Sequence, residues 1–182
     1  ATHSVWDALA APMLALPPER RKRVLLLGLG GGSVARILRA LAPDASIVGV
    51  EFDPEVLAAA YAHFDLRSLG LEVVEGDALE VLQRENRFFD LVVDDVFLGS
   101  YRKPAWIPRP GLELALCRLC EGGLLVSNTV GEARRVAASL RAQRPGLLRI
   151  DVRDYENRVL VAGPARLDAR SLRRAVRASP VL

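Results

Sequence analysis

The sequence predicts an α/β protein in which helices flank a doubly wound, mostly parallel sheet of the Rossmann-like kind. Two observations support this fold class. Short apolar and β-branched runs alternate with amphipathic helical segments, which implies right-handed crossovers between parallel strands. The run Phe89–Val93 is also rich in apolar residues, as expected of a strand that is covered on both faces.

The first half of the chain contains four predicted strands: Arg23–Leu27, Ser46–Val50, Leu71–Val74 and Phe89–Val93. Between the first two, apolar residues from Val34 to Leu41 recur at i, i+3, i+4 and i+7, and Pro43-Asp44 ends this helix. Asp53-Pro54 combines a capping aspartate with a proline at the first helical position, so the next helix begins there. Asp77 is the predicted cap of a helix that runs to Arg84.

The second half continues the alternation after a long loop, about Val96–Pro110, which contains three prolines. The predicted helices are 112–120, 132–143 and 168–177, and the predicted strands are 124–127, 147–152 and 158–162. Gly122-Gly123 and Pro145-Gly146 are the expected ends of the first two helices. The polar segment Arg153–Asn157 separates the last two strands, which predicts an antiparallel hairpin at one edge of the sheet.

Length and composition fit one domain with a core of its own. The chain has 182 residues, of which 51% are apolar and 26% are charged. Its longest uncharged stretch, Val24–Ala35, is shorter than the roughly 20 residues of a membrane span, and no secretion signal is recognisable. We therefore expect a cytoplasmic protein without a membrane partner, divided into an N-terminal segment (1–22), a Rossmann-like domain (23–165) and a basic tail (166–182).

Charge and cysteine usage argue against two further classes of site. The net charge is only +3, and the clusters Arg20–Arg23 and Arg166–Arg177 lack interleaved aromatic residues, so a nucleic-acid partner is disfavoured. Cys117 and Cys120 form a lone C-x-x-C, with no further ligands at zinc-site spacing. We expect no metal site and two buried, reduced thiols.

A glycine-rich loop, Gly28–Ser33, follows the first predicted strand. Glycine allows positive φ and close approach of a ligand, and the following helix offers free N–H groups. No lysine follows the glycines, which excludes a P-loop, and no histidine follows His63, which argues against a serine hydrolase. A dinucleotide site with Ser33 in place of the third glycine, an S-adenosylmethionine site and simple strand–helix packing all remain open.

Acidic residues follow the next three predicted strands, where ligands of such sheets bind. Glu51 can accept hydrogen bonds from ribose hydroxyls, which suits either nucleotide. Asp77 can cap its helix or accept a hydrogen bond from an adenine amino group. Asp94 and Asp95 repel each other unless they are partnered, so we expect one to face the cofactor and the other a helix N-terminus. Only the S-adenosylmethionine hypothesis uses the whole series of acids.

Five motifs together resemble the spermidine synthase branch of the class I S-adenosylmethionine-dependent methyltransferase superfamily. They are VLLLGLGGGS (24–33), VGVEFDPEV (48–56), VVEGDALEVL (73–82), FDLVVDDVF (89–97) and NRVLVAG (157–163). The resemblance implies a seven-stranded sheet whose last strand is antiparallel, with S-adenosylmethionine bound in the domain 23–165. By position, Glu51 resembles the ribose-binding acid, Asp77 the adenine-binding acid and Asp95 the general base that acts on an attacking amine.

The sequence departs from the polyamine aminopropyltransferases of this family at two acidic positions. The glycine loop has Gly31 where those enzymes carry an aspartate, and Leu98 replaces the second acid of their D-S-S-D-P motif. Charge-assisted hydrogen bonds from such acids to polyamine amines contribute roughly 1.5–3 kcal/mol each. Only about 22 residues precede the first strand, where the family usually has a small β-domain. These departures favour ordinary over decarboxylated S-adenosylmethionine.

We therefore expect a spermidine synthase-like transferase, most simply a methyltransferase acting on a small molecule or amine. The predicted cofactor-binding residues are Gly28, Gly30, Gly31, Gly32, Glu51, Phe52, Gly76, Asp77, Ala78 and Asp94. Asp95 is the predicted catalytic residue, and Tyr101 and Trp106 are predicted to form the substrate wall, unless they anchor the loop or a homodimer. Aminopropyl transfer, a non-catalytic binding or dimerisation module and an NAD enzyme are the alternatives.

Overall fold

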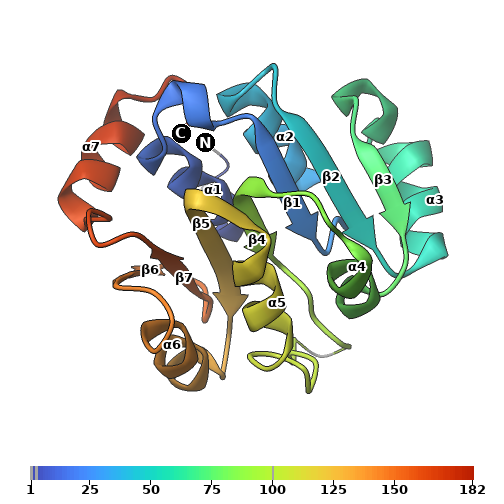
Figure 1. The fold of residues 1–182 in the computed structure, drawn as a ribbon. Coiled ribbons are helices and arrows are strands. Elements are labelled where there is room, and N and C mark those ends of the chain that lie inside the picture. The colour runs from blue at the N-terminus through green and yellow to red at the C-terminus, as the bar shows by residue number, and fades with distance from the viewer. Residues whose placement is uncertain (1, 3, 100) are drawn as a thin grey trace.

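The computed structural model describes residues 2, 4–99 and 101–182, which form a sheet of seven strands with helices on both faces (Figure 1). The strands are β1 (Arg23–Leu27), β2 (Ser46–Glu51), β3 (Glu72–Glu75), β4 (Phe89–Asp94), β5 (Leu119–Thr129), β6 (Gly146–Asp151) and β7 (Arg158–Gly163). Their order is β3-β2-β1-β4-β5-β7-β6. Strands β1 to β5 pair in parallel, and β7 is antiparallel to both β5 and β6. The predicted fold class and edge hairpin are therefore confirmed.

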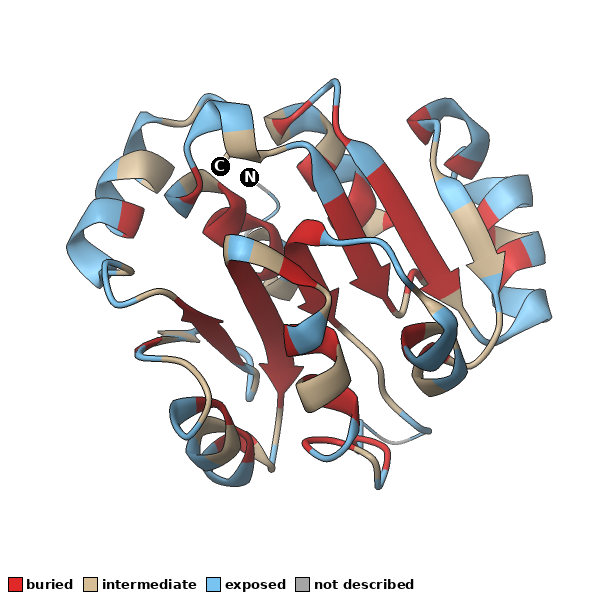
Figure 2. Ribbon diagram, viewed as in Figure 1, coloured by how far each residue is buried: buried red, intermediate tan, exposed pale blue. Residues whose placement is uncertain are grey.

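The helices occupy the two faces of the sheet in two groups. They are α1 (Val5–Ala10), α2 (Ser33–Leu41), α3 (Pro54–His63), α4 (Ala78–Arg84), α5 (Gly111–Cys117), α6 (Ala133–Arg141) and α7 (Ala169–Ala178), with short 3₁₀ turns at Ala11–Ala15, Pro18–Arg20 and Leu66–Leu69. Helices α4, α5 and α6 cover one face, and α1, α2 and α3 cover the other (Figure 1). The central strands are consequently buried on both sides (Figure 2).

The N-terminal segment contains structure that the sequence analysis did not predict. Helix α1 is capped by Ser4, and its Leu9 packs with Met13 in the core beneath β1. Both side chains are fully buried. Apolar burial of this kind contributes roughly 1.5–3 kcal/mol per large side chain, which explains why the segment is ordered against the sheet.

The boundary between α5 and β5 differs from the prediction. Helix α5 ends at Cys117, and β5 begins at Leu119, so Gly122-Gly123 lies inside the strand rather than at a helix end. Gly122 has φ +73°, and the β4–β5 register shifts here, as at a β-bulge. Cys117 is exposed and Cys120 is half-buried. The expectation of two buried thiols is therefore wrong, although both thiols are free.

Asp90 interrupts the apolar run of β4 for a structural reason. It is buried, and its Oδ2 accepts hydrogen bonds from the N–H groups of Lys22 and Arg23 at 3.3 and 3.0 Å. Its Oδ1 lies 3.4 Å from Nε of Arg20. The side chain thus fixes the entry of the chain into β1, at the end of the sheet opposite the carboxyl ends of the strands.

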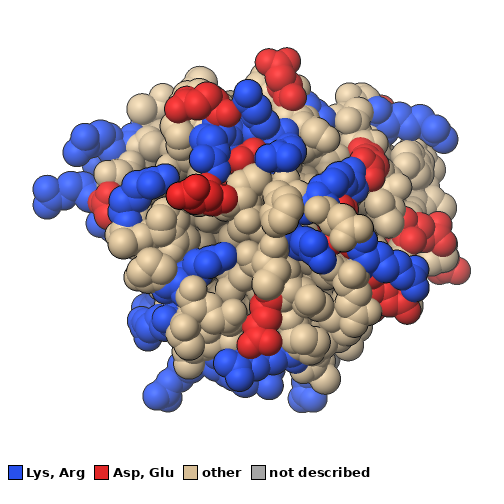
Figure 3. Space-filling view, viewed as in Figure 1, with Lys and Arg blue, Asp and Glu red and all other residues tan. Residues whose placement is uncertain are grey.

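Two whole-molecule features bear on possible partners. Basic side chains are spread over the face shown in Figure 3 with acidic ones among them, and they gather toward α6 and α7. Among the described residues, no helix combines the length and the apolar character needed to cross a membrane.

Candidate active site

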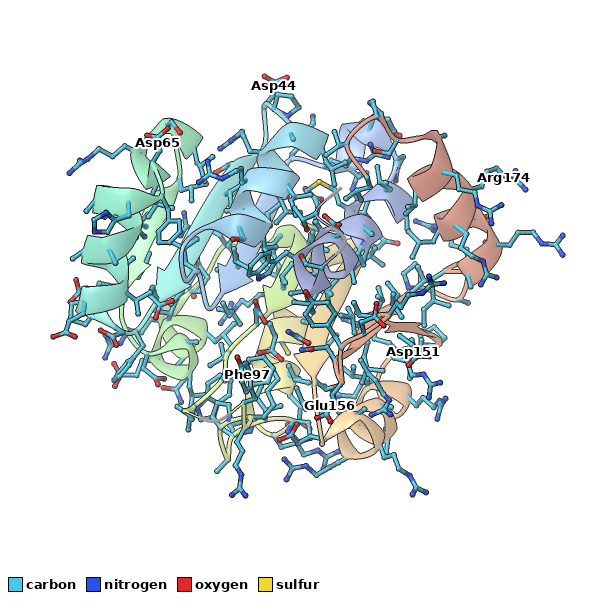
Figure 4. The ribbon with its side chains drawn as sticks, turned by 180° about the vertical axis from the view of Figure 1, so that it is seen from behind. Asp44, Asp65, Phe97, Asp151, Glu156 and Arg174 are labelled. Carbon is cyan, nitrogen blue, oxygen red and sulfur yellow. The ribbon has the colours of Figure 1, made fainter. Side chains whose placement is uncertain are left out.

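A cavity of about 640 Å³ opens at the carboxyl ends of β1, β2 and β4. Its lining includes most of the predicted site: Gly28, Gly30, Gly31, Glu51, Phe52, Gly76, Asp77, Ala78, Asp95 and Trp106. Phe97, labelled in Figure 4, belongs to the same lining and lies at the lower end of the sheet in that view, where these strands end. Gly32, Asp94 and Tyr101 do not line it. Parallel strands that end on one side of the sheet bring these distant residues together.

The glycines in the bend between β1 and α2 meet different structural requirements. Gly28 has φ +84°, and a Cβ there would lie only 2.6 Å from the carbonyl oxygen of Asp95. Gly30 has φ +53°, and nothing lies within 4 Å of the position of a Cβ. Gly32 precedes α2, and its Cβ would lie 2.8 Å from the Leu66 side chain. Gly28 and Gly32 therefore serve packing, whereas the bend at Gly30 is open to the cavity.

Glu51, at the end of β2, binds the glycine bend. Its Oε2 accepts a hydrogen bond from the N–H of Gly30 at 2.8 Å, and its Oε1 accepts from the N–H groups of Phe52 and Asp53 at 3.0 and 3.1 Å. A carboxylate has about four acceptor sites, and three are used here, so Oε2 can still accept one further hydrogen bond. Phe52 lines the cavity, and it is 70% exposed, which is unusual for a large apolar side chain.

Asp77 uses its two oxygens differently. Oδ1 caps α4 by accepting hydrogen bonds from the N–H groups of Leu79 and Glu80 at 2.8 and 3.2 Å. Oδ2 takes part in no hydrogen bond among the described residues, and the residue lines the cavity. From the sequence alone, helix capping and ligand binding are competing roles for this side chain. The structure leaves one oxygen for each.

Asp94 is buried away from the cavity in an ion pair. Its Oδ1 lies 2.8 Å from Nζ of Lys103, and both side chains are fully buried. Its Oδ2 accepts a hydrogen bond from the hydroxyl of Ser127 at 2.6 Å. Asp94 was predicted to contact the cofactor or a helix N-terminus; it faces a lysine instead, because the loop after β4 folds back over it.

Asp95 is the acid of this pair that reaches the cavity. Its Oδ1 accepts a hydrogen bond from Nδ2 of Asn128 at 2.8 Å, and Oδ1 of Asn128 accepts one from Nδ2 of Asn157 at 3.0 Å. Burial raises the pKa of Asp95 to about 6, with a smaller contribution from neighbouring Asp94, while Asn128 and Lys103 oppose the rise. A carboxylate with this pKa can take up a proton near neutral pH.

The loop after β4 contributes an apolar wall. Phe97, Leu98, Pro104 and Trp106 line the cavity. Tyr101 is 72% exposed and forms a T-shaped contact with the Phe97 ring, but it does not line the cavity. A β-bridge between Leu98 and Arg102 turns the loop back on itself.

Several residues at the site were not found from the sequence. Ser127 is the last residue of the fifth predicted strand and Asn128 follows it, so the search of strand ends that located the acids would have found them. Lys103 and Asn157 carried no local signal, because their partners lie far away in the chain. Trp6 reaches the cavity from α1 and had no sequence signal either. Among the residues that the structure describes, no group of three or more His, Cys, Asp or Glu side chains is placed to hold a metal ion.

Comparisons with known proteins agree with this geometry. A family model described as "Methyltransferase domain" matches residues 24–107. The polyamine aminopropyltransferase of Chromobacterium violaceum is 34% identical over 109 residues, covering 59% of this chain and 42% of that protein. The eEF1A lysine and N-terminal methyltransferase homolog of Drosophila melanogaster is 40% identical over 97 residues, covering 51% of this chain and 14% of that protein.

Two solved structures share the fold across 96% of this chain. Human methyltransferase-like protein 13 in complex with SAH has a TM-score of 0.80 at 24% identity, with 93% of that chain covered. A probable spermidine synthase from Corynebacterium glutamicum has a TM-score of 0.78 at 21% identity, with 70% covered. The chain therefore has the class I methyltransferase fold, and part of it is similar in sequence to polyamine aminopropyltransferases and methyltransferases. It spans less than half the length of the curated relatives above.

Proposed function

We propose that this domain binds S-adenosylmethionine in the cavity and transfers its methyl group to a small-molecule acceptor. One observation carries the proposal. The carboxylates of Glu51 and Asp77 line one cavity, and the bend at Gly30 beside them is open. A nucleoside needs such an arrangement, because its ribose hydroxyls and adenine amino group are donors and its sugar must lie close to the backbone.

The residues at the nucleoside end of the cavity, which we define as Gly28–Gly31, Glu51, Phe52 and Asp77, fit this group. Glu51 has one acceptor site left on Oε2 for a ribose hydroxyl, and Oδ2 of Asp77 is free to accept from the adenine amino group. Phe52 would cover the base with its exposed ring. The matching structure with bound SAH and the methyltransferase family model support the same ligand.

The small number of acidic side chains in the part of the cavity that would hold the acceptor supports methyl transfer over aminopropyl transfer. Gly31 and Leu98 stand where the resemblance implies acids that hold amines, and both line the cavity. Asp94 is engaged by Lys103, which leaves Asp95 as the carboxylate beside the apolar wall. Aminopropyl transfer remains the second candidate, because relatives named polyamine aminopropyltransferase match part of the chain. The resemblance also implies that Asp95 corresponds to the general base of those enzymes.

Positioning provides most of the rate in a displacement of this kind. S-Adenosylmethionine supplies a methyl group on a positively charged sulfur. The glycine bend and Glu51 would orient the nucleoside, and Asp95 would take the proton of the attacking nucleophile. A non-catalytic module would lack this last step but could retain the binding site.

A ligand panel tests the proposal. Thermal unfolding and calorimetry are measured with S-adenosylmethionine, its decarboxylated form, S-adenosylhomocysteine, methylthioadenosine and NAD. We expect S-adenosylmethionine and S-adenosylhomocysteine to bind best, and a ligand at 100 times its Kd stabilises the fold by about 2.7 kcal/mol. Tighter binding of decarboxylated S-adenosylmethionine, with turnover of putrescine, would establish the second candidate instead. Stabilisation by none of the adenosyl ligands would overturn both. The predicted cytoplasmic location and homodimer stay predictions.

A further inference from the structure

The part of the cavity away from the nucleoside end is almost entirely apolar. Trp6 enters it from α1, and Phe97, Leu98, Pro104 and Trp106 enter it from the loop after β4. Trp6 and Leu98 are 42% and 58% exposed, although both are large apolar side chains. We call these five residues, together with Asp95, the acceptor end.

A buried ion pair holds this wall in place. Nζ of Lys103 lies 2.8 Å from Asp94 and 4.5 Å from the centre of the Phe97 ring. The backbone N–H of Lys103 also donates to Oε1 of Glu132 at 3.3 Å. Phe97 precedes Lys103 in the loop and Pro104 follows it, so this one buried side chain holds the wall residues on both sides of it. A preformed apolar surface binds a rigid apolar body at little entropic cost.

The acceptor end offers one carboxylate to a ligand. The charge of Asp94 is neutralised by Lys103, and its second oxygen is taken by Ser127. Oδ1 of Asp95 is held by Asn128, so the carboxylate has a fixed orientation and its other oxygen is left for one polar group. The other five residues defined as the acceptor end are uncharged, and Leu98 occupies the place of a further acid, so none of them can pair with a second cation.

We propose that the acceptor is a flat, apolar molecule that carries one hydroxyl or amino group as its nucleophile and no charged group besides it. The inference rests on the proposed methyl transfer and specifies its substrate class. In the reaction, Asp95 takes the proton of the nucleophile as the oxygen or nitrogen bonds to the methyl carbon, and the electron pair of the broken carbon–sulfur bond stays on sulfur. The apolar wall holds the body of the acceptor.

Calorimetry tests this class by binding rather than turnover. Three acceptors are titrated into protein saturated with S-adenosylhomocysteine: 2-naphthol, decahydro-2-naphthol and 1,4-diaminobutane. The first two share one skeleton and one hydroxyl but differ in flatness, and the third is an aliphatic dication. We expect 2-naphthol to bind at least tenfold more tightly than the diamine and severalfold more tightly than its saturated counterpart. Equal or tighter binding of the diamine would overturn the inference.

Variants at Leu98 provide a matched test of charge. Leu98 is exposed enough for Leu98→Asp and its neutral control Leu98→Asn to fold equally well. Both variants lose the apolar contact of Leu98, and we expect Leu98→Asp, which also adds a carboxylate, to narrow the preference for 2-naphthol over the diamine at least fivefold more than Leu98→Asn does. An unchanged ratio in Leu98→Asp would contradict the inference while leaving the proposed function intact. Failure of S-adenosylhomocysteine to bind would remove the proposed function and the inference together.

Discussion

The two ends of the cavity are held in place by contacts of very different range. At the nucleoside end, Glu51 and Asp77 mostly accept hydrogen bonds from backbone N–H groups one to three residues along the chain. At the acceptor end, Asp95 accepts a hydrogen bond from a side chain of β5, 33 positions away, and so does the buried Asp94 next to it. Trp6, which also lines the acceptor end, comes from helix α1 near the N-terminus.

This difference separates the nucleoside end, which depends on local motifs, from the acceptor end, which depends on the tertiary fold of one loop. Backbone donors at strand ends recur wherever the same bend and strands are built, so the nucleoside end needs little more than its motifs. The acceptor end depends on which side chains the loop after β4 folds over. A change there can alter the substrate without altering the fold.

The largest expected effect concerns the buried anchor of the acceptor end. Lys103→Met leaves Asp94 buried without its cation, which should lower the free energy of unfolding by about 3–5 kcal/mol. The double variant Asp94→Asn/Lys103→Met should recover most of that loss, because no unpaired charge remains. Urea denaturation measures both.

An exposed ion pair provides the control for this experiment. Arg109 and Glu113 are also 2.8 Å apart, but their side chains are 64% and 39% exposed. Arg109→Met should therefore change the free energy of unfolding by no more than about 1 kcal/mol. Equal losses for Lys103→Met and the double variant would show that the anchor acts through packing rather than charge.

The next effect concerns the nucleoside end. Glu51→Ala removes the acceptor of the Gly30 N–H and the proposed partner of the ribose, and hydrogen bonds to charged groups contribute about 1.5–3 kcal/mol. We expect the Kd for S-adenosylhomocysteine to rise about 10- to 100-fold in calorimetry. Glu55→Ala, an exposed change on α3 that does not touch the cavity, should leave the Kd unchanged. A similar loss in both variants would count against a direct role for Glu51.

The pH dependence of Asp95 gives a test that needs no substrate. Its pKa of about 6 in the folded state lies above the ordinary value of 3.8. The folded state therefore binds this proton more tightly, and the stabilisation present below about pH 4 is lost as the pH rises through about 6. Asp95→Asn should accordingly stabilise the protein progressively from pH 4 to pH 8, by about 3 kcal/mol at the upper end. Urea denaturation across this range checks it, and a constant difference between variant and wild type would contradict the raised pKa.

The smallest effect separates the two roles of Asp77. Asp77→Ala should cost about 1 kcal/mol of stability because α4 loses its cap, and it should also weaken adenosyl binding. Asp77→Asn should retain the cap, since an amide oxygen accepts the same hydrogen bonds. Asp168→Ala removes the equivalent cap of α7, away from the cavity, so it should lower stability without changing ligand affinity. Unchanged affinity in Asp77→Ala would remove the adenine role.

Most of the sheet could be predicted because burial on both faces gives long apolar runs in the sequence. Strands β1, β2 and β4 follow the expected boundaries within one residue. The start of β5 could not be predicted, because its first residues are ordered by pairing Leu119 with Phe89 across a bulge rather than by local pattern. Helix α1 is short, and its order depends on packing against α2 and β5, which no local pattern indicates.

The sequence by itself determined where the glycine bend and the acids lie along the chain, because turns and strand ends are written in neighbouring residues. It also indicated that Asp94 and Asp95 could not both remain unpartnered, since adjacent buried charges repel. Only the tertiary structure decided which of the two faces the cavity. That choice depends on a lysine nine positions away and a serine and an asparagine on another strand, and these groups become neighbours only when the loop closes over the sheet.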